Sequence, residues 1–156
     1  MLSIAHAATG AFIATKIGNP LLSAPIILLS HYAQDAIHHY DAGTGLSSGQ
    51  KTRRTAFILG SLDLLLAALT VIIMYPDSIP IIRNSSFIIQ NQAPLWGALL
   101  GLLPDFLESP RNFLHYEPHW LRPINRFHAL FHHSIKDIAA GLAPQVILLV
   151  TLWILH

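Results

Sequence analysis

The chain has 156 residues, of which 53% are hydrophobic and only 11% are charged, against about 25% charged residues in an average soluble domain. The formal net charge of +1 and the lack of basic runs give no signature of a nucleic-acid partner, and the lack of cysteine excludes disulfides and thiolate metal sites. With a mean hydropathy of +0.50, the composition predicts a single membrane-embedded domain over residues 1–156.

Apolar segments predict an all-α, polytopic membrane protein of about five helices. In chain order these are residues 4–17, 21–36, 55–75, 87–103 and 138–155. The first two are short and are separated by the helix-breaking sequence Gly18-Asn19-Pro20. The segments 55–75 and 138–155 have the length of about 20 residues that a hydrocarbon core of about 30 Å requires. They are therefore the clearest candidates for membrane spans.

Basic residues are concentrated in the second and fourth connections between these segments. Residues 41–54 contain three and residues 105–137 contain four, whereas the other two connections contain one each. By the positive-inside rule, the two basic connections are cytoplasmic. The prediction is an integral membrane protein with its N-terminus in the cytoplasm and its C-terminus outside.

Two histidine-rich clusters carry potential metal ligands at helical spacing. In the first, His31, Asp35 and His38 stand at positions i, i+4 and i+7, which share one face of a helix, and His39 is the alternative to His38. Without cysteine, histidine and carboxylate groups are the donors available for a divalent cation. The first cluster is therefore predicted to ligate a metal.

The second cluster opens the last predicted helix. His128 and His132 stand four residues apart and share a face, so both are predicted metal ligands. His133 points elsewhere and is predicted to act on the substrate or in catalysis.

Three further candidates lie outside the clusters. Asp63 stands within a predicted span, where a carboxylate costs about 2.5–3.5 kcal/mol and usually faces a partner or cavity. Asp105 is expected to close the fourth helix, and His6 lies among alanines at the start of the first. In the predicted topology all three, with both clusters, fall toward the cytoplasmic side.

Three of these motifs occur in an order that resembles a known family. They are His6 within a small-residue helix, Gly-Leu-Leu-Pro-Asp at residues 101–105, and His-x-x-x-His-His-Ser at residues 128–134. The chain is similar to small bacterial membrane-bound metal-dependent hydrolases, which are distantly similar to zinc-dependent phospholipase C. The resemblance implies a hydrolase of the bacterial cytoplasmic membrane, with His6, Asp105, His128 and His132 among the metal ligands.

The predicted function is hydrolysis of a phosphoester in a phospholipid or another amphiphile. One or two ions, zinc or alternatively manganese, would activate a water, with Asp35 or Asp105 as the bridging ligand. Asp35, Asp105 and His133 are the predicted catalytic residues. The predicted phosphate-binding residues are Arg53, Arg54, Arg122 and Arg126.

Two other functions are compatible with the same ligands. A divalent-metal or proton transporter would use them as a transit site, although the apolar outer halves of the third and fifth helices favour a one-sided site. A structural metal protein or a haem binder is the second alternative, but haem needs one or two axial histidines rather than several carboxylates.

Overall fold

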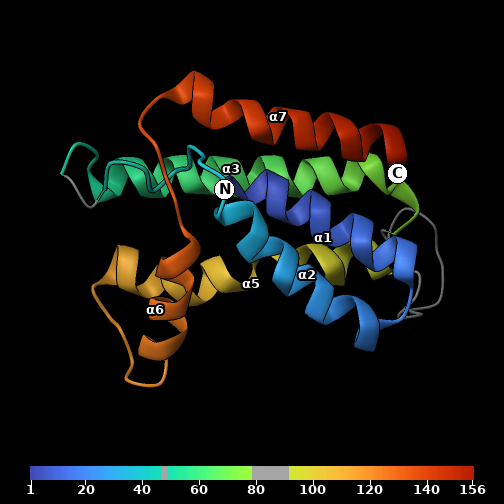
Figure 1. The fold of residues 1–156 in the computed structure, drawn as a ribbon, viewed down its shortest axis with the longest axis horizontal. Helices are drawn as coiled ribbons and strands as arrows, with labels where there is room; N and C mark the ends of the chain where they lie inside the picture. The colour runs from blue at the N-terminus through green and yellow to red at the C-terminus, as the bar shows by residue number, and fades with distance from the viewer. Residues whose placement is uncertain (47–48, 79–91) are drawn as a thin grey trace.

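The computed structural model describes residues 1–46, 49–78 and 92–156. Within these ranges the chain forms six α-helices and one short 3-10 helix and contains no strand, which confirms the all-α prediction (Figure 1). The elements are α1 (Ser3–Ile17), α2 (Pro20–Asp35), α3 (Arg53–Met74), η1 (Pro76–Ser78), α5 (Ala93–Leu114), α6 (Arg122–Phe131) and α7 (Ile138–Leu155).

The helices α1 and α2 form a hairpin whose turn is encoded in three residues. Gly18 ends α1 in the left-handed conformation, with φ of 69°, which a residue without Cβ adopts at little cost. Asn19 caps α2 by accepting a hydrogen bond from the backbone of Leu21, and Pro20 occupies the first helical position, where its missing N–H is not needed. The hairpin returns the end of α2 to the start of α1.

The sequence prediction of where α5 ends was wrong. α5 continues to Leu114, so Asp105 lies inside the helix and not at its end. Pro104 lies inside α5 and removes one helical hydrogen bond, but the buried packing of α5 against α1 outweighs that loss. Residues 87–91 of the predicted fourth helix lie outside the described residues.

The second histidine cluster does not open the last helix, as had been predicted. It ends a separate short helix, α6, and an extended connection then leads to α7. His132 is the C-terminal capping residue of α6, with extended backbone angles (φ −77°, ψ 99°). The ten residues of α6 are too short and polar to be recognised among membrane-length segments.

Glycines bring the backbones of α1 and α5 into direct contact. A Cβ atom on Gly101 would lie 2.4 Å from the carbonyl oxygen of His6, and one on Gly10 would lie 2.2 Å from that of Gly97. Gly97 and Gly101 are four residues apart and form the small-residue spacing that lets apolar helices approach closely. This contact fixes His6 beside the middle of α5.

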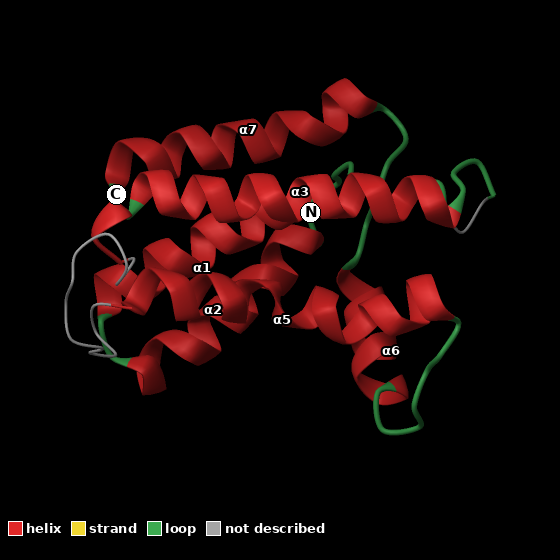
Figure 2. Ribbon diagram, turned by 180° about the vertical axis from the view of Figure 1, so that it is seen from behind, coloured by secondary structure: helices red, strands yellow, loops and turns green. Residues whose placement is uncertain are grey.

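The helices α3 and α7 are long and apolar enough to cross a membrane, and Figure 2 shows both from behind. The residue colours in Figure 1 show that they run in the same direction. Only 22% and 17% of their most apolar stretches are buried, unlike the core helices of a soluble protein. Large apolar side chains therefore remain exposed, among them Leu66 at 54% and Ile154 at 75%. The buried amide of Gln145 ties α7 to the rest of the chain, donating to Tyr40 O at 2.7 Å and accepting from Leu2 N at 2.8 Å.

Candidate metal centre

The last turn of α2 supplies the first two site residues. His31 and Asp35 lie one turn apart and are both fully buried, with His31 Nε2 3.3 Å from Asp35 Oδ2. α2 ends at Asp35, so His38 does not continue their helical face. His38 is exposed, and the following residue, His39, is the one buried in the site.

Backbone pairing joins the two histidine-rich segments. His39 N donates to His133 O at 3.1 Å, Ile135 N donates to His39 O at 2.7 Å, and His133 N donates to Asp35 O at 3.1 Å. The result is an isolated parallel bridge between His39 and Ser134. This pairing places His39 and His132, which are far apart in sequence, with their ring centroids 4.8 Å apart.

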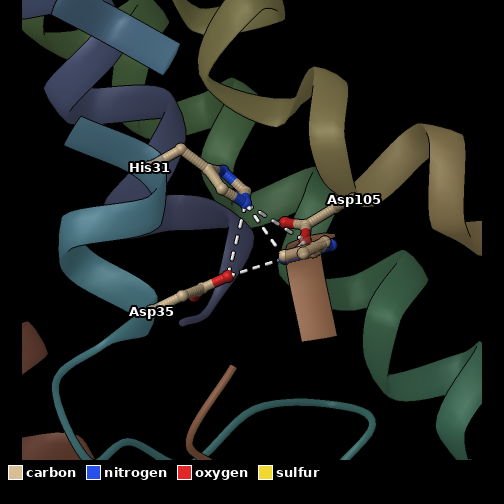
Figure 3. Close-up of side chains that lie close together, drawn as sticks. His31, Asp35 and Asp105 are labelled. Atoms are coloured by element: carbon tan, nitrogen blue, oxygen red, sulfur yellow. Dashed lines mark hydrogen bonds and ion pairs between the residues drawn. The ribbon is translucent and has the colours of Figure 1, made fainter. Parts of the chain in front are cut away.

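Four side chains form the first candidate metal site, and three of them are labelled in Figure 3. They are His31, Asp35, Asp105 and His128, whose ligand atoms all lie within 4.8 Å of one another. His31 Nε2 lies 3.3 Å from His128 Nε2 and 3.7 Å from Asp105 Oδ1. His128 Nε2 lies 2.8 Å from Asp35 Oδ2 and 3.8 Å from Asp105 Oδ1. Tetrahedral ligands about 2.1 Å from a zinc ion would lie about 3.4 Å apart, so these spacings fit a tetrahedral cation.

Neighbouring groups orient both histidines of the first site. His31 Nδ1 donates to Gly101 O at 2.7 Å, and His128 Nδ1 lies 3.1 Å from Glu108 Oε2. With its proton on Nδ1, a neutral His31 turns the lone pair of Nε2 toward the carboxylate of Asp35. Two electron-pair donors then face each other, and a cation between them would satisfy both.

Asp35 also belongs to a second group, with His39 and His132. Asp41 completes it, because Asp41 Oδ2 lies 2.9 Å from His132 Nε2 and 3.2 Å from His39 Nε2. His39 Nδ1 donates to Ile37 O at 2.8 Å, so the Nε2 lone pair of a neutral His39 faces these carboxylates. Asp41 was not among the predicted ligands, although its position two residues after His39 puts both side chains on one side of an extended chain.

His6 lies beside the two groups. Its Nε2 is 3.1 Å from Asp35 Oδ1, its ring stacks on His31 with centroids 3.9 Å apart, and its buried Nδ1 has no hydrogen-bond partner. The amino group of Met1 also contacts Asp35 and lies 3.1 Å from His6 Nε2. Asp35 is thus enclosed by histidines contributed from α1, α2, α6 and the segment after α2.

The carboxylates shift the protonation equilibria of the histidines at the end of α6. Burial lowers the pKa of His128, but its contacts with Asp35 and Glu108 outweigh this and raise it to about 9. Contacts with Asp35 and Asp41 likewise outweigh burial and raise the pKa of His132 to about 10. Burial raises the pKa of Asp41, but hydrogen bonds from His132 and His39 bring it below its usual range. The negative charge of the carboxylates at this site favours the binding of cations. In the metal-free protein, the cations bound are protons on the histidines.

Asp63 and His133, two of the predicted site residues, have other contacts. The carboxylate of Asp63 accepts hydrogen bonds from Ser3 N at 2.6 Å and Ile4 N at 3.3 Å, so it caps the N-terminus of α1 and belongs to neither metal group. His133 is exposed, and its Nδ1 donates to Ala36 O at 3.3 Å. The extended backbone after α6 turns it away from the site.

The four predicted phosphate-binding arginines are dispersed. Arg53 lines the cavity described below, whereas Arg54 and Arg126 are exposed and line no part of it. Arg122 Nε lies 3.7 Å from Glu117 Oε2, in the loop before α6. Arg111, which had not been predicted, lines the cavity and forms an ion pair with Glu108.

A cavity of about 810 Å³ adjoins the two groups of ligands. Asp41, Asp105 and His132 contribute to its wall, and Arg53 and Arg111 line it as well. The ligand groups are therefore accessible to a small molecule.

Comparison with known protein families, with curated proteins and with solved structures finds no match to this chain. The resemblance to membrane-bound metal-dependent hydrolases stays a prediction.

Proposed function

We propose that this protein is a membrane-bound hydrolase of phosphoesters with two divalent cations bridged by Asp35. The observation that carries the proposal is the membership of Asp35 in both groups of ligands. A carboxylate shared between two cations is typical of sites in which paired metal ions act on a phosphoester. Zinc is the preferred ion because nitrogen donors predominate and the first group has tetrahedral spacing, and manganese is the alternative.

The charges of the site favour an anionic substrate. Asp35, Asp41, Asp105 and Glu108 supply four negative charges, and Arg111 supplies one positive charge beside Glu108. Two divalent cations together with Arg111 would exceed the four carboxylates by one positive charge. A phosphoester entering the cavity would therefore meet a net positive site at the metals.

The chain's own residues would have distinct roles in this reaction. The cations would lower the pKa of a bound water and neutralise the phosphoryl oxygens. Glu108 Oε2, 3.1 Å from His128 Nδ1, would favour the orientation of His128 in which Nε2 lies in the first group. Gly101 O accepts a hydrogen bond from His31 Nδ1 and orients His31 in the same way. Asp105 is half-buried, with one oxygen in the first group and its side chain in the cavity wall, so it is placed to contact an attacking water.

Membrane insertion is part of the proposal. Two helices have the length and composition of membrane spans and keep most of their apolar surface exposed. We propose that the N-terminus lies in the cytoplasm, on the distribution of Lys and Arg. The proposal of a bacterial cytoplasmic membrane rests on the resemblance to bacterial membrane-bound hydrolases.

The test is metal analysis followed by a substrate screen. Protein purified in detergent without chelator should contain about two divalent ions per chain and should hydrolyse one class among phosphomonoesters and phosphodiesters. His128→Ala and His132→Ala should lose both properties. His156→Ala is the matched control and should keep them, because the His156 ring contacts Trp153 and Tyr75 and belongs to neither group of ligands. Less than one metal per chain after supplementation would refute the metal site. Full metal content without turnover of any ester would refute the hydrolase and favour transport.

A further inference from the structure

The cavity beside the ligand groups is polar at one wall and apolar at another. It extends between facing sides of α3 and α5. On α3, Phe57, Gly60 and Leu64 stand at positions i, i+3 and i+7, and on α5 Phe106 and Phe113 stand at positions i and i+7. Phe57 and Phe113 meet edge to face with centroids 5.7 Å apart.

This apolar wall continues into the exposed apolar surface of α3. Phe57 is 59% exposed and Phe106 is 41% exposed although both line the cavity. The same helix has the length and hydropathy of a membrane span. The cavity thus connects a face suited to lipid with the carboxylates and histidines of the metal centre.

Charge distribution indicates which end of a ligand lies at each wall. Arg111 lines the cavity together with the ligands Asp105 and His132, which lie at the metal centre. On the α3 wall between Phe57 and Leu64, the charged side chain that lines the cavity is Asp63, whose carboxylate accepts hydrogen bonds from Ser3 N and Ile4 N. The other side of this wall is formed by aromatic side chains of α3 and α5, among them Phe57, Phe106 and Phe113. An anionic group therefore fits at the metal centre, and an uncharged chain fits against α3.

We propose that the α3–α5 cavity binds the alkyl chain of a membrane-resident phosphate amphiphile and holds its phosphate at the metal centre. The proposal rests on the proposed function for the reaction, but binding is a separate property that can be measured without turnover. It predicts selectivity for long-chain over short-chain phosphoesters.

Gly60 offers a way to fill the cavity without altering any ligand. A Cβ atom there would meet only Ala42 Cβ, at 3.8 Å, which is ordinary van der Waals contact. Gly60→Phe should therefore fold and place its ring in the cavity. Ala68→Phe is the matched control, because Ala68 lies on the same helix, is exposed and does not line the cavity.

The binding experiment uses an alkylphosphonate of sixteen carbons with a diazirine in its chain, in nanodiscs loaded with zinc. Photo-crosslinks mapped by mass spectrometry should fall on α3 and α5 around Phe57 and Phe106. Excess hexadecylphosphonate should abolish them, and hexadecanol, which lacks the phosphonate, should not. Gly60→Phe should reduce labelling at least fivefold with unchanged metal content, and Ala68→Phe should leave it unchanged.

Turnover is measured in parallel with methyl and hexadecyl p-nitrophenyl phosphate, which share one leaving group. Labelling of α3 and α5 without turnover of either ester would support the bound amphiphile and count against the hydrolase. Turnover without labelling, labelling elsewhere on the protein, or equal labelling in Gly60→Phe and wild type would overturn the binding proposal while leaving the hydrolase in place. Absence of both would overturn both.

Discussion

The strongest prediction concerns Asp35, the residue shared by the two groups of ligands. Asp35→Asn keeps the volume of the side chain and removes the charge that five histidines surround at 2.8–3.9 Å. A four-ligand structural zinc binds with about 10–16 kcal/mol, so one ligand is worth about 2.5–4 kcal/mol, or roughly a 10²–10³-fold loss of affinity. Because Asp35 belongs to both groups, both ions should be weakened together.

The assay is competition with a chelator of known zinc affinity, followed by elemental analysis of the recovered protein. The metal content of Asp35→Asn should be less than one ion per chain, against about two in the wild type. Turnover should be lost together with the ions. The control is His38→Ala, because His38 is exposed, stacks only on His133 and belongs to neither group. Loss of a single ion in Asp35→Asn, with the second bound at wild-type affinity, would refute the bridging arrangement. Unchanged affinity for both would remove Asp35 from the site.

Four other predictions test separate parts of the structure. Asp63→Ala should lower the free energy of unfolding by about 1–2 kcal/mol, as loss of a helix cap does, without changing metal content, and a loss of metal would put Asp63 back among the ligands. The pKa values of His128 (about 9) and His132 (about 10) are raised in the folded protein, so their protonated forms stabilise the metal-free fold. This contribution to the free energy of unfolding should be complete below pH 6.5 and should be lost as the pH rises through 9–10. Binding of zinc near pH 7 should accordingly release up to two protons from these histidines. Calorimetry in buffers of different ionisation enthalpy measures this release. No proton release would contradict the assignment of His128 and His132 as metal ligands. Reporter fusions after Arg54 and after His156 should report opposite sides of the membrane, and the same side for both would contradict the predicted orientation.

Local sequence signals predicted much of the helical structure. The segments 55–75 and 138–155 correspond to α3 and α7 within two residues at each end, because long apolar runs have few alternatives to a helix. The break at Gly18-Asn19-Pro20 was also found, since each of these residues favours a helix end or start. The extent of α5 and the presence of α6 were not predicted, because tertiary packing kept a proline inside one helix and the other was short and polar.

The candidate ligands were recognised by residue type, but their arrangement was not predicted. The prediction from helical spacing that His31 and Asp35 lie together was correct. The same spacing favoured His38 as a ligand, whereas the structure buries His39, because α2 ends at Asp35 and does not continue to residue 38. His39 reaches the site through backbone pairing with residues 133–135, and such long-range pairing leaves no periodic trace in the sequence. Asp41 was not predicted because its two-residue spacing from His39 brings the two side chains together only where the chain is extended.

The position of the metal centre along α3 explains why a cavity has to accompany it. Asp63 caps α1, and Met1, at the start of the same segment, contacts Asp35, so the ligands lie near the level of Asp63. Ten residues separate Asp63 from Arg53 at the start of α3, which at 1.5 Å per residue places the centre about 15 Å along this helix. On the proposed membrane placement, that level is near the middle of a hydrocarbon core of about 30 Å, where neither water nor phosphate enters unaided. The cavity lined by both Arg53 and Asp63 spans this distance. It would let water reach the cations from the cytoplasmic side.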